Sequence, residues 1–170
     1  MYAIKRAHIY SLMFLALVIH MALLDHIQIS GSKPDIFLIM VVFIALFFGQ
    51  RAGFESGVIA GVMKDLFTLD YFGMNVFILA VTGLVIGSIN TKFSRDSKGA
   101  HAFIVAVFTV AAMSLHYILF SIFSNPIGMR FTNYLSASII PTVIYTSIIA
   151  IPIFSKLIGL YNLRDMDELI

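Results

Sequence analysis

The sequence predicts an all-α integral membrane protein, a single domain built as a bundle of six transmembrane helices. Two observations predict this class. Only 12% of the 170 residues are charged and 60% are hydrophobic, whereas a soluble domain carries about 25% charge. Apolar stretches that approach the ~20 residues of a transmembrane helix also recur along the whole chain. Such sparse charge cannot coat a soluble surface, which excludes both a soluble enzyme and a disordered chain.

Six apolar segments are expected, over residues 7–24, 35–48, 52–67, 73–90, 100–123 and 134–154, with a short tail at 156–170. The first follows Lys5 and Arg6 and has no small-residue cleavage site after it, so an uncleaved helix is predicted rather than a signal peptide. The second is an unbroken apolar run of only about 20 Å of helix. Gly49, Gln50 and Arg51 separate it from the third. These two segments are therefore expected to form a tight helical hairpin.

The basic residues are divided unevenly between the two sides of the predicted bundle. With a cytoplasmic N-terminus, eight of them lie on the cytoplasmic side, namely Lys5, Arg6, Arg51, Lys92, Arg95, Lys98, Lys156 and Arg164. Three lie on the opposite side, namely Lys33, Lys64 and Arg130. This distribution follows the positive-inside rule and predicts that both termini are cytoplasmic.

One alternative for the second and third segments would leave the membrane orientation of the other four segments unchanged. They could form a re-entrant hairpin that enters from outside, which would place Arg51 and Glu55 at membrane depth. Each charge there costs about 2.5–3.5 kcal/mol on insertion scales. Two short but complete spans are therefore favoured.

A row of small residues runs along the third segment. Five residues recur at intervals of four: Gly49, Gly53, Gly57, Gly61 and Asp65. Positions four apart lie on one helix face, and glycines there let another backbone come close. Packing within this chain and a face for a partner helix are both open. Gly83 and Gly87 of the fourth segment repeat the spacing and are candidates for an intramolecular mate.

Asp65 is expected near the outer end of the third segment. It is either an interfacial acid that caps or hydrogen-bonds a loop, or a buried acid that organises the outer mouth or contacts a partner. Pro34 and Asp35 indicate a helix start, because proline suits the first turn and an acid there meets the positive end of the helix dipole. Gly73 and Asn75 similarly indicate a tight turn and a capping or bridging amide.

Polar side chains gather around the fifth and sixth segments. The candidates for lining a polar cavity are His116, Tyr117, Asn125, Tyr134 and Tyr145. Hydrogen bonds between helices are the alternative, because polar side chains in a membrane bundle mostly face other helices. No catalytic residue, cofactor site or metal site is expected, since the chain has no cysteine, no phosphate-binding loop and no helical histidine pair with a nearby acid. A net charge of +2 offers no basic surface for nucleic acid.

The order and spacing of these motifs resemble the rod shape-determining protein MreD family, most densely over residues 33–92. The motif residues are Pro34, Asp35, Gly49, Arg51, Gly53, Gly57, Gly61, Asp65, Leu66, Phe67, Gly73, Asn75, Gly83 and Gly87. The resemblance implies a non-enzymatic scaffold in the bacterial inner membrane that serves cell elongation and lateral peptidoglycan synthesis. It implies a bitopic MreC-type partner and a wider complex with MreB, RodA and a class B penicillin-binding protein.

The same resemblance implies a fold similar to the S components of energy-coupling-factor vitamin transporters, so a substrate-binding subunit of that type is the alternative function. That alternative predicts a ligand-filled outer cavity between the fourth to sixth segments. It also predicts a docking face of small residues on the first segment. The first segment is instead rich in Leu, Ile, Met and Phe, with Ser11, Ala16 and Ala22 as its small residues. This composition disfavours the transporter alternative.

Reporter fusions test the predicted topology. Fusions at Gln50 and Ser97 should report the cytoplasmic side and fusions at Asp70 and Gly128 the opposite side, because the basic residues concentrate on the cytoplasmic side. An outside signal at Ser97 would contradict the whole arrangement, since Lys92, Arg95 and Lys98 make that loop the most strongly basic one.

Overall fold

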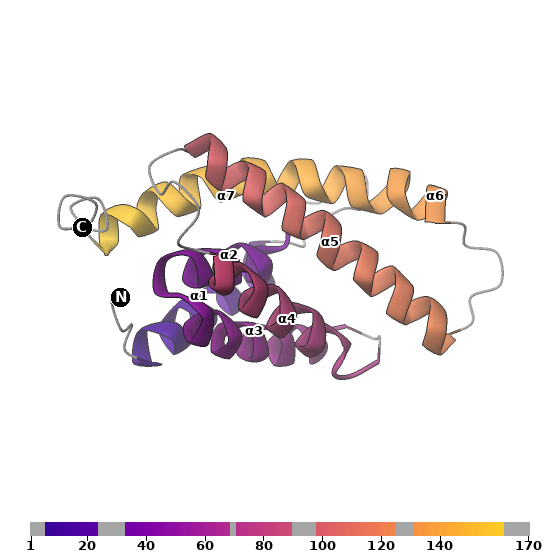
Figure 1. The fold of residues 1–170 in the computed structure, drawn as a ribbon, viewed down its shortest axis with the longest axis horizontal. Helices are drawn as coiled ribbons and strands as arrows, with labels where there is room; N and C mark the ends of the chain where they lie inside the picture. Colours follow the sequence, from indigo (N-terminus) through magenta and orange to yellow (C-terminus); the bar gives the residue numbers. More distant parts are fainter. Residues whose placement is uncertain (1–5, 24–32, 69–70, 90–97, 125–130, 162–170) are drawn as a thin grey trace.

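The computed structural model describes residues 6–23, 33–68, 71–89, 98–124 and 131–161, and within these ranges every regular element is helical (Figure 1). The elements are α1 (Arg6–Leu23), α2 (Ile36–Phe48), α3 (Gln50–Asp65), α4 (Met74–Ile89), α5 (Lys98–Ser124), α6 (Phe131–Tyr134), the π-helical turn η2 (Leu135–Ile139) and α7 (Ile140–Leu160). The last three follow one another directly as a single helical stretch, Phe131–Leu160. The all-helical class and the six predicted helical segments are therefore present.

Three segments differ in extent from the prediction by two residues or more, among them α5, which begins at Lys98 rather than at residue 100. The helix α3 begins at Gln50 rather than at residue 52, because Gln50 and Arg51 are exposed and a helix end tolerates polar residues that an apolar run excludes. The sixth segment covers residues 131–160 rather than 134–154. Its last turns continue past Lys156 because Leu157 is buried in the core.

Ring contacts show that α1 and α2 run in opposite directions and that α7 ends beside the start of α1. His8 near the start of α1 and Phe48 at the end of α2 both contact Tyr161, which caps the end of α7, with centroids 5.9 and 5.7 Å apart. At the other end, His20 of α1 contacts Phe37 near the start of α2 at 5.1 Å. We call the first the hairpin end, since the α2–α3 connection lies there, and the second the loop end, where α3 leads into α4. The hairpin end is on the left in Figure 1.

The helix α2 forms the centre of the bundle. All 13 of its residues are buried, and a helix that is apolar all round is expected to be surrounded on every side. Phe43 packs against Phe47 and Phe154 with ring centroids 4.8 and 5.3 Å apart. Gly49 ends α2 and starts α3 with φ +85°, a left-handed conformation that suits glycine. Gly49 is therefore the single residue that joins α2 to α3 in the predicted tight hairpin.

The glycine row of α3 packs directly on α4. A Cβ on Gly57 would lie 2.7 Å from the carbonyl carbon of Leu79 and 2.8 Å from Cα of Ala80, and a Cβ on Gly61 would lie 2.6 Å from N of Val76. Gly83 and Gly87 face back, because a Cβ on either would meet the backbone of the first turns of α3 or of the residue before it. The glycine row therefore packs within the chain, against α4, rather than forming a face for a partner helix.

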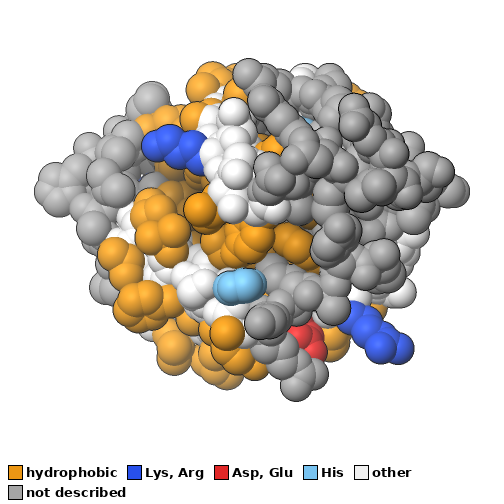
Figure 2. Space-filling model, turned by 90° about the vertical axis from the view of Figure 1, so that its left-hand side faces the viewer, with side chains coloured by type: hydrophobic (Ala, Val, Ile, Leu, Met, Phe, Trp, Pro, Cys, Tyr) orange, Lys and Arg blue, Asp and Glu red, His pale blue; other side chains and the backbone are white. Residues whose placement is uncertain are grey.

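The two longest helices carry much of the exposed apolar surface. Of the described helices, Gly99–Phe123 and Phe131–Leu160 are long and apolar enough to cross a membrane by length and composition, while Ala7–His20, Ile36–Phe48 and Met74–Ile89 are shorter apolar helices. The exposed side chains of the two long helices include Phe103, Val107, Val110, Ile118, Ile122, Ile140, Ile144, Ile148 and Ile151. Figure 2, which looks onto the hairpin end, shows apolar side chains reaching the surface between scattered charged ones. The exposed apolar side chains of the two long helices suit lipid rather than water.

Gly57→Ala tests the close approach of α3 and α4. Alanine is about 1 kcal/mol better than glycine in a helix interior, but the new methyl group would meet backbone atoms that cannot move aside separately. Overpacking of this kind costs about 1–3 kcal/mol, so we expect a lower free energy of unfolding in detergent micelles. Gly159→Ala is the matched control, because a Cβ there meets nothing within 4 Å. If Gly57→Ala were as stable as the parent, or more stable, like the Gly159→Ala control, the close packing of α3 on α4 would be contradicted.

Candidate functional site

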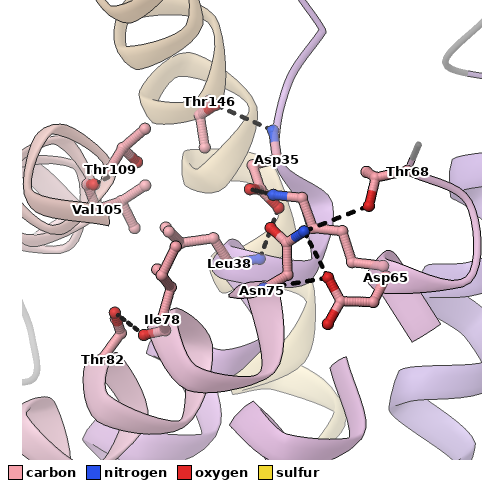
Figure 3. Close-up of polar contacts among 11 residues, drawn as sticks. Asp35, Leu38, Asp65, Thr68, Asn75, Ile78, Thr82, Val105, Thr109 and Thr146 are labelled. Carbon is pink, nitrogen blue, oxygen red and sulfur yellow. Dashed lines mark hydrogen bonds and ion pairs between the residues drawn. The ribbon is translucent and has the colours of Figure 1, made fainter. Parts of the chain in front are cut away.

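Asp35 joins three helices at the loop end. Its Oδ1 accepts a hydrogen bond from the Leu38 amide at 3.0 Å, which caps α2, and its own amide donates to Oγ1 of Thr146 in α7 at 3.1 Å. Its Oδ2 is 2.5 Å from Nζ of Lys64 in α3. Figure 3 shows these contacts converging on the start of α2. Asp35 is thus the N-cap of α2, and Pro34 lies before the helix rather than in its first turn as predicted. Asp35 also connects α2 to α3 and α7.

Asp65 is buried and caps a different helix from its own. Its Oδ2 accepts from the amides of Gly73 at 2.8 Å and Val76 at 3.3 Å, and its Oδ1 accepts from the amide of Asn75 at 3.1 Å. The first amides of a helix have no partner within it, and a carboxylate there also meets the positive end of the dipole. Asp65, the last residue of α3, therefore caps the N-terminus of α4.

Asn75 and Gly73 complete this cap. Nδ2 of Asn75 donates to Oδ1 of Asp65 at 2.8 Å and lies 3.4 Å from Oγ1 of Thr68. Gly73 has φ +97°, which glycine adopts without strain. The bridging amide and the tight turn predicted here are both present. Lys64 and Asp65 are neighbours in sequence but do not pair, since Lys64 reaches Asp35 instead.

A cavity of about 350 Å³ lies at the loop end, and all six helical segments or the residues next to them line it. The polar lining residues are His20, Lys33, Asp35, Lys64, Thr68, Asn75, His116, Tyr134 and Thr142. The apolar ones are Pro34, Phe67, Ile78, Leu79, Ala112 and Met113. We call this the loop-end cavity.

The predicted cavity residues fall into three groups. His116 and Tyr134 line the loop-end cavity. Tyr117 does not, because it lies one position further around α5 and stacks on Tyr134 with ring centroids 5.2 Å apart. Tyr145 is also outside the lining, and Asn125 lies outside the described residues.

The lining residues from α1, α3 and the start of α2 were not predicted as part of a cavity. Their sequence signals are separate: a lone histidine in an apolar helix, a proline–aspartate helix start, and a lysine beside an acid. Only the folded chain brings His20, Lys33 and Lys64 to the same place as His116. A tertiary assembly of this kind leaves no periodic pattern in the chain.

Among the residues that the structure describes, no group of three histidine, aspartate or glutamate side chains is arranged to hold a metal ion. Burial raises the pKa of the Tyr161 phenol above its ordinary value, so this residue stays neutral in its aromatic contacts at the hairpin end. The polar groups mainly cap helices and join them.

The fold and this polar cluster define the class of the protein: an all-helical membrane protein whose buried polar side chains connect its helices. A family model described as the rod shape-determining protein MreD matches residues 3–164, nearly the whole chain. The chain therefore belongs to the MreD family, whose members are membrane proteins of cell-shape determination and are not known as enzymes. The resemblance seen in the sequence is thereby confirmed. No curated protein and no solved structure matches the chain.

Asp65→Asn tests the cap on α4. The amide keeps one oxygen but turns an N–H₂ group toward backbone donors, so at least one buried donor loses its acceptor. A buried unsatisfied donor costs about 1–3 kcal/mol, and we expect the free energy of unfolding in detergent to fall by that amount. Thr68→Val is the control, because it removes only the 3.4 Å contact to Asn75 and should change stability little. If both variants unfolded with the same free energy as the parent, the carboxylate of Asp65 would not be needed to cap α4.

Proposed function

We propose that this chain is a non-enzymatic scaffold of the bacterial cell-elongation machinery that binds an MreC-type partner in the inner membrane. The observation that carries this is the match of the MreD family model across residues 3–164. The wider complex would contain MreB, RodA and a class B penicillin-binding protein. The arrangement of the described polar groups supports a structural role, because Asp35 and Asp65 are engaged in capping and joining helices.

The proposal includes six membrane spans with both termini in the cytoplasm. Two features support it. Each helical segment runs from one end of the bundle to the other, so an even number returns the chain to the end where it started. The hairpin end, with Arg51 and Lys156, is also the end that the positive-inside rule assigns to the cytoplasm.

The partner is expected to bind on an outer face rather than on the glycine row of α3. The row is covered by α4 and leaves no room for another backbone. Exposed apolar side chains remain on α1, such as Tyr10 and Phe14, and on α5, such as Phe103 and Ile122. A transmembrane helix of an MreC-type protein would pack there by van der Waals contact.

A substrate-binding S-type subunit is the second candidate, and the loop-end cavity is the observation that favours it. The cavity has walls from α4, α5 and the sixth segment, where that function requires a ligand site. The described part of α1 argues against it, because Ala16 is fully buried and the exposed side chains Tyr10, Phe14 and Leu15 are large. The exposed Ser11 beside them gives a coupling subunit little of the small-residue face that it needs.

Depletion and replacement in a rod-shaped bacterium test the scaffold function. Cells depleted of their own MreD-family protein should become round, and expression of this chain together with its cognate MreC-type protein should restore rods. Affinity purification of the chain from those membranes should recover the MreC-type protein in near-stoichiometric amount. Recovery of ATP-binding coupling subunits instead, with round cells, would overturn the scaffold function and support the transporter subunit.

A further inference from the structure

The loop-end cavity contains polar groups that the fold itself does not satisfy. Buried polar groups nearly always have a hydrogen-bond partner, so each exception calls for an explanation. Two such groups line this cavity, one on α4 and one on the sixth segment. The cavity measures about 350 Å³, which is far larger than the voids of a close-packed interior and within the range of ligand sites.

The first group is the hydroxyl of Thr142, a residue that is only 8% exposed. A threonine in a helix often donates to the carbonyl four residues back, as Thr82 and Thr109 both do here at 2.7 Å (Figure 3). The residue four positions before Thr142 is Ser138, which belongs to the π-helical turn η2, where the chain departs from the α-helical register. Within the described ranges, no residue is hydrogen-bonded to the Thr142 hydroxyl.

The second group is the side-chain oxygen of Asn75, a residue that is 2% exposed. Its Nδ2 donates to Oδ1 of Asp65 at 2.8 Å. Because a carboxylate only accepts, this bond fixes the orientation of the amide. None of the residues that the structure describes donates to the remaining oxygen, Oδ1 of Asn75. The cavity therefore has an acceptor on α4 and a hydroxyl on the sixth segment, and both are without a partner in the described chain.

The charges of the lining favour an uncharged ligand. Lys64 is paired with Asp35, and Lys33 is engaged in an interaction of its own. An ionic ligand would bury a charge that has no opposite charge to meet it, which is costly. The bond to Asp35 uses one of the three ammonium donors of Lys64, so another can donate to a ligand oxygen. A matching ligand donates to Asn75 and accepts from Lys64 or Thr142.

The rest of the lining favours a ligand with an apolar portion over water alone. It includes Ile78 and Leu79 of α4 and Ala112 and Met113 of α5. Water forms no hydrogen bond with these side chains, whereas burial of an apolar group against them is favourable. Ligand sites typically combine such apolar walls with a few polar groups that fix the orientation of the ligand.

We propose that the loop-end cavity binds an uncharged amphiphile whose head group has a hydroxyl donor beside an oxygen acceptor. The head group bonds to Asn75, Thr142 and Lys64, and the apolar portion packs against α4 and α5. A glycerol ester has this chemistry, in a membrane lipid or in a soluble short-chain form. The proposal goes beyond the scaffold function, which needs no ligand, and does not depend on it.

The experiment uses the full chain in phosphatidylcholine nanodiscs, with monooleoylglycerol as the probe. Monooleoylglycerol should raise the midpoint of thermal unfolding by several degrees, because a ligand that binds only the folded state stabilises it. Native mass spectrometry should detect one bound copy. Oleoyl lysophosphatidic acid, which differs only by its phosphate, should give a smaller shift.

Glycerol monobutyrate distinguishes the two sources of the ligand, since it has the same head group on a short, water-soluble chain. A shift with this ester would support the proposal with a soluble ligand. A shift with monooleoylglycerol alone would support it with a membrane lipid.

Thr142→Val tests the hydroxyl with little change of shape. Without ligand, this variant should unfold at the same temperature as the parent or higher, because it loses no internal hydrogen bond. Its affinity for monooleoylglycerol should fall roughly fivefold, as expected for one lost hydrogen bond. Thr109→Val is the matched control, because its hydroxyl bonds within α5 and it lies outside the lining. It should lose stability and keep the affinity of the parent.

Ala112→Leu tests the cavity itself by filling it, and should weaken binding about tenfold or more. Ala111→Leu should bind like the parent, since Ala111 is the preceding residue of α5 and is exposed. If Ala112→Leu does not elute as a folded protein in size-exclusion chromatography, the comparison of Thr142→Val with Thr109→Val carries the test.

Three results would overturn the proposal. The first is no shift with either glycerol ester, or the same shift in the parent and in the cavity variants. The second is a shift with lysophosphatidic acid that equals or exceeds the shift with monooleoylglycerol. The third is a loss of stability in ligand-free Thr142→Val as large as in Thr109→Val, which would mean that the Thr142 hydroxyl is bonded within the protein.

Discussion

The close approach of the α3 and α4 backbones is the contact on which the rest of the bundle depends. Between helices in lipid there is little hydrophobic driving force, so packing contacts and hydrogen bonds must hold them together. Dispersion falls off steeply with separation, and the row of Gly53, Gly57 and Gly61 removes the side chains that would keep the two backbones apart. The cap from Asp65 then closes the connection at one end and Gly87 meets the start of α3 at the other. The pair forms one wall against which α2 is buried.

The two acids of the loop end, the buried Asp65 and the partly buried Asp35, have separate structural roles. Asp65 acts within the α3–α4 pair, whereas Asp35 connects α2 to Lys64 of that pair and to Thr146 of α7. The Lys64–Asp35 pair is partly buried, and removing one partner would leave an uncompensated charge at this end of the bundle. The helix starts at the loop-end cavity are thus held in place by carboxylates that already have hydrogen-bond partners.

The sequence predicts the helices well because their signal is local. The apolar run of α2 and the four-residue spacing of the glycines contain the information that the structure uses, and Gly83 and Gly87 could be matched to the row by their spacing alone. The pairing of Lys64 with Asp35 could not be predicted, since it depends on which way two neighbouring side chains project after α2 and α3 fold back. The π-helical turn and the assembly of the cavity are also tertiary. Tyr117 illustrates the limit, because one residue of rotation separates it from the cavity that His116 lines.

The unequal lengths of the helices have a consequence for the surrounding lipid. At about 1.5 Å per residue, the 16-residue helices α3 and α4 measure roughly 24 Å, whereas the 27-residue α5 measures roughly 40 Å. A bilayer has a hydrocarbon thickness of about 30 Å, so in the proposed six-span arrangement α5 must tilt while the exposed side of α3 and α4 meets a layer thicker than itself. Hydrophobic mismatch is relieved by local thinning of the bilayer or by association with other short helices. The molecule would therefore deform the membrane on one flank only, and neighbours with short spans would be drawn to that flank.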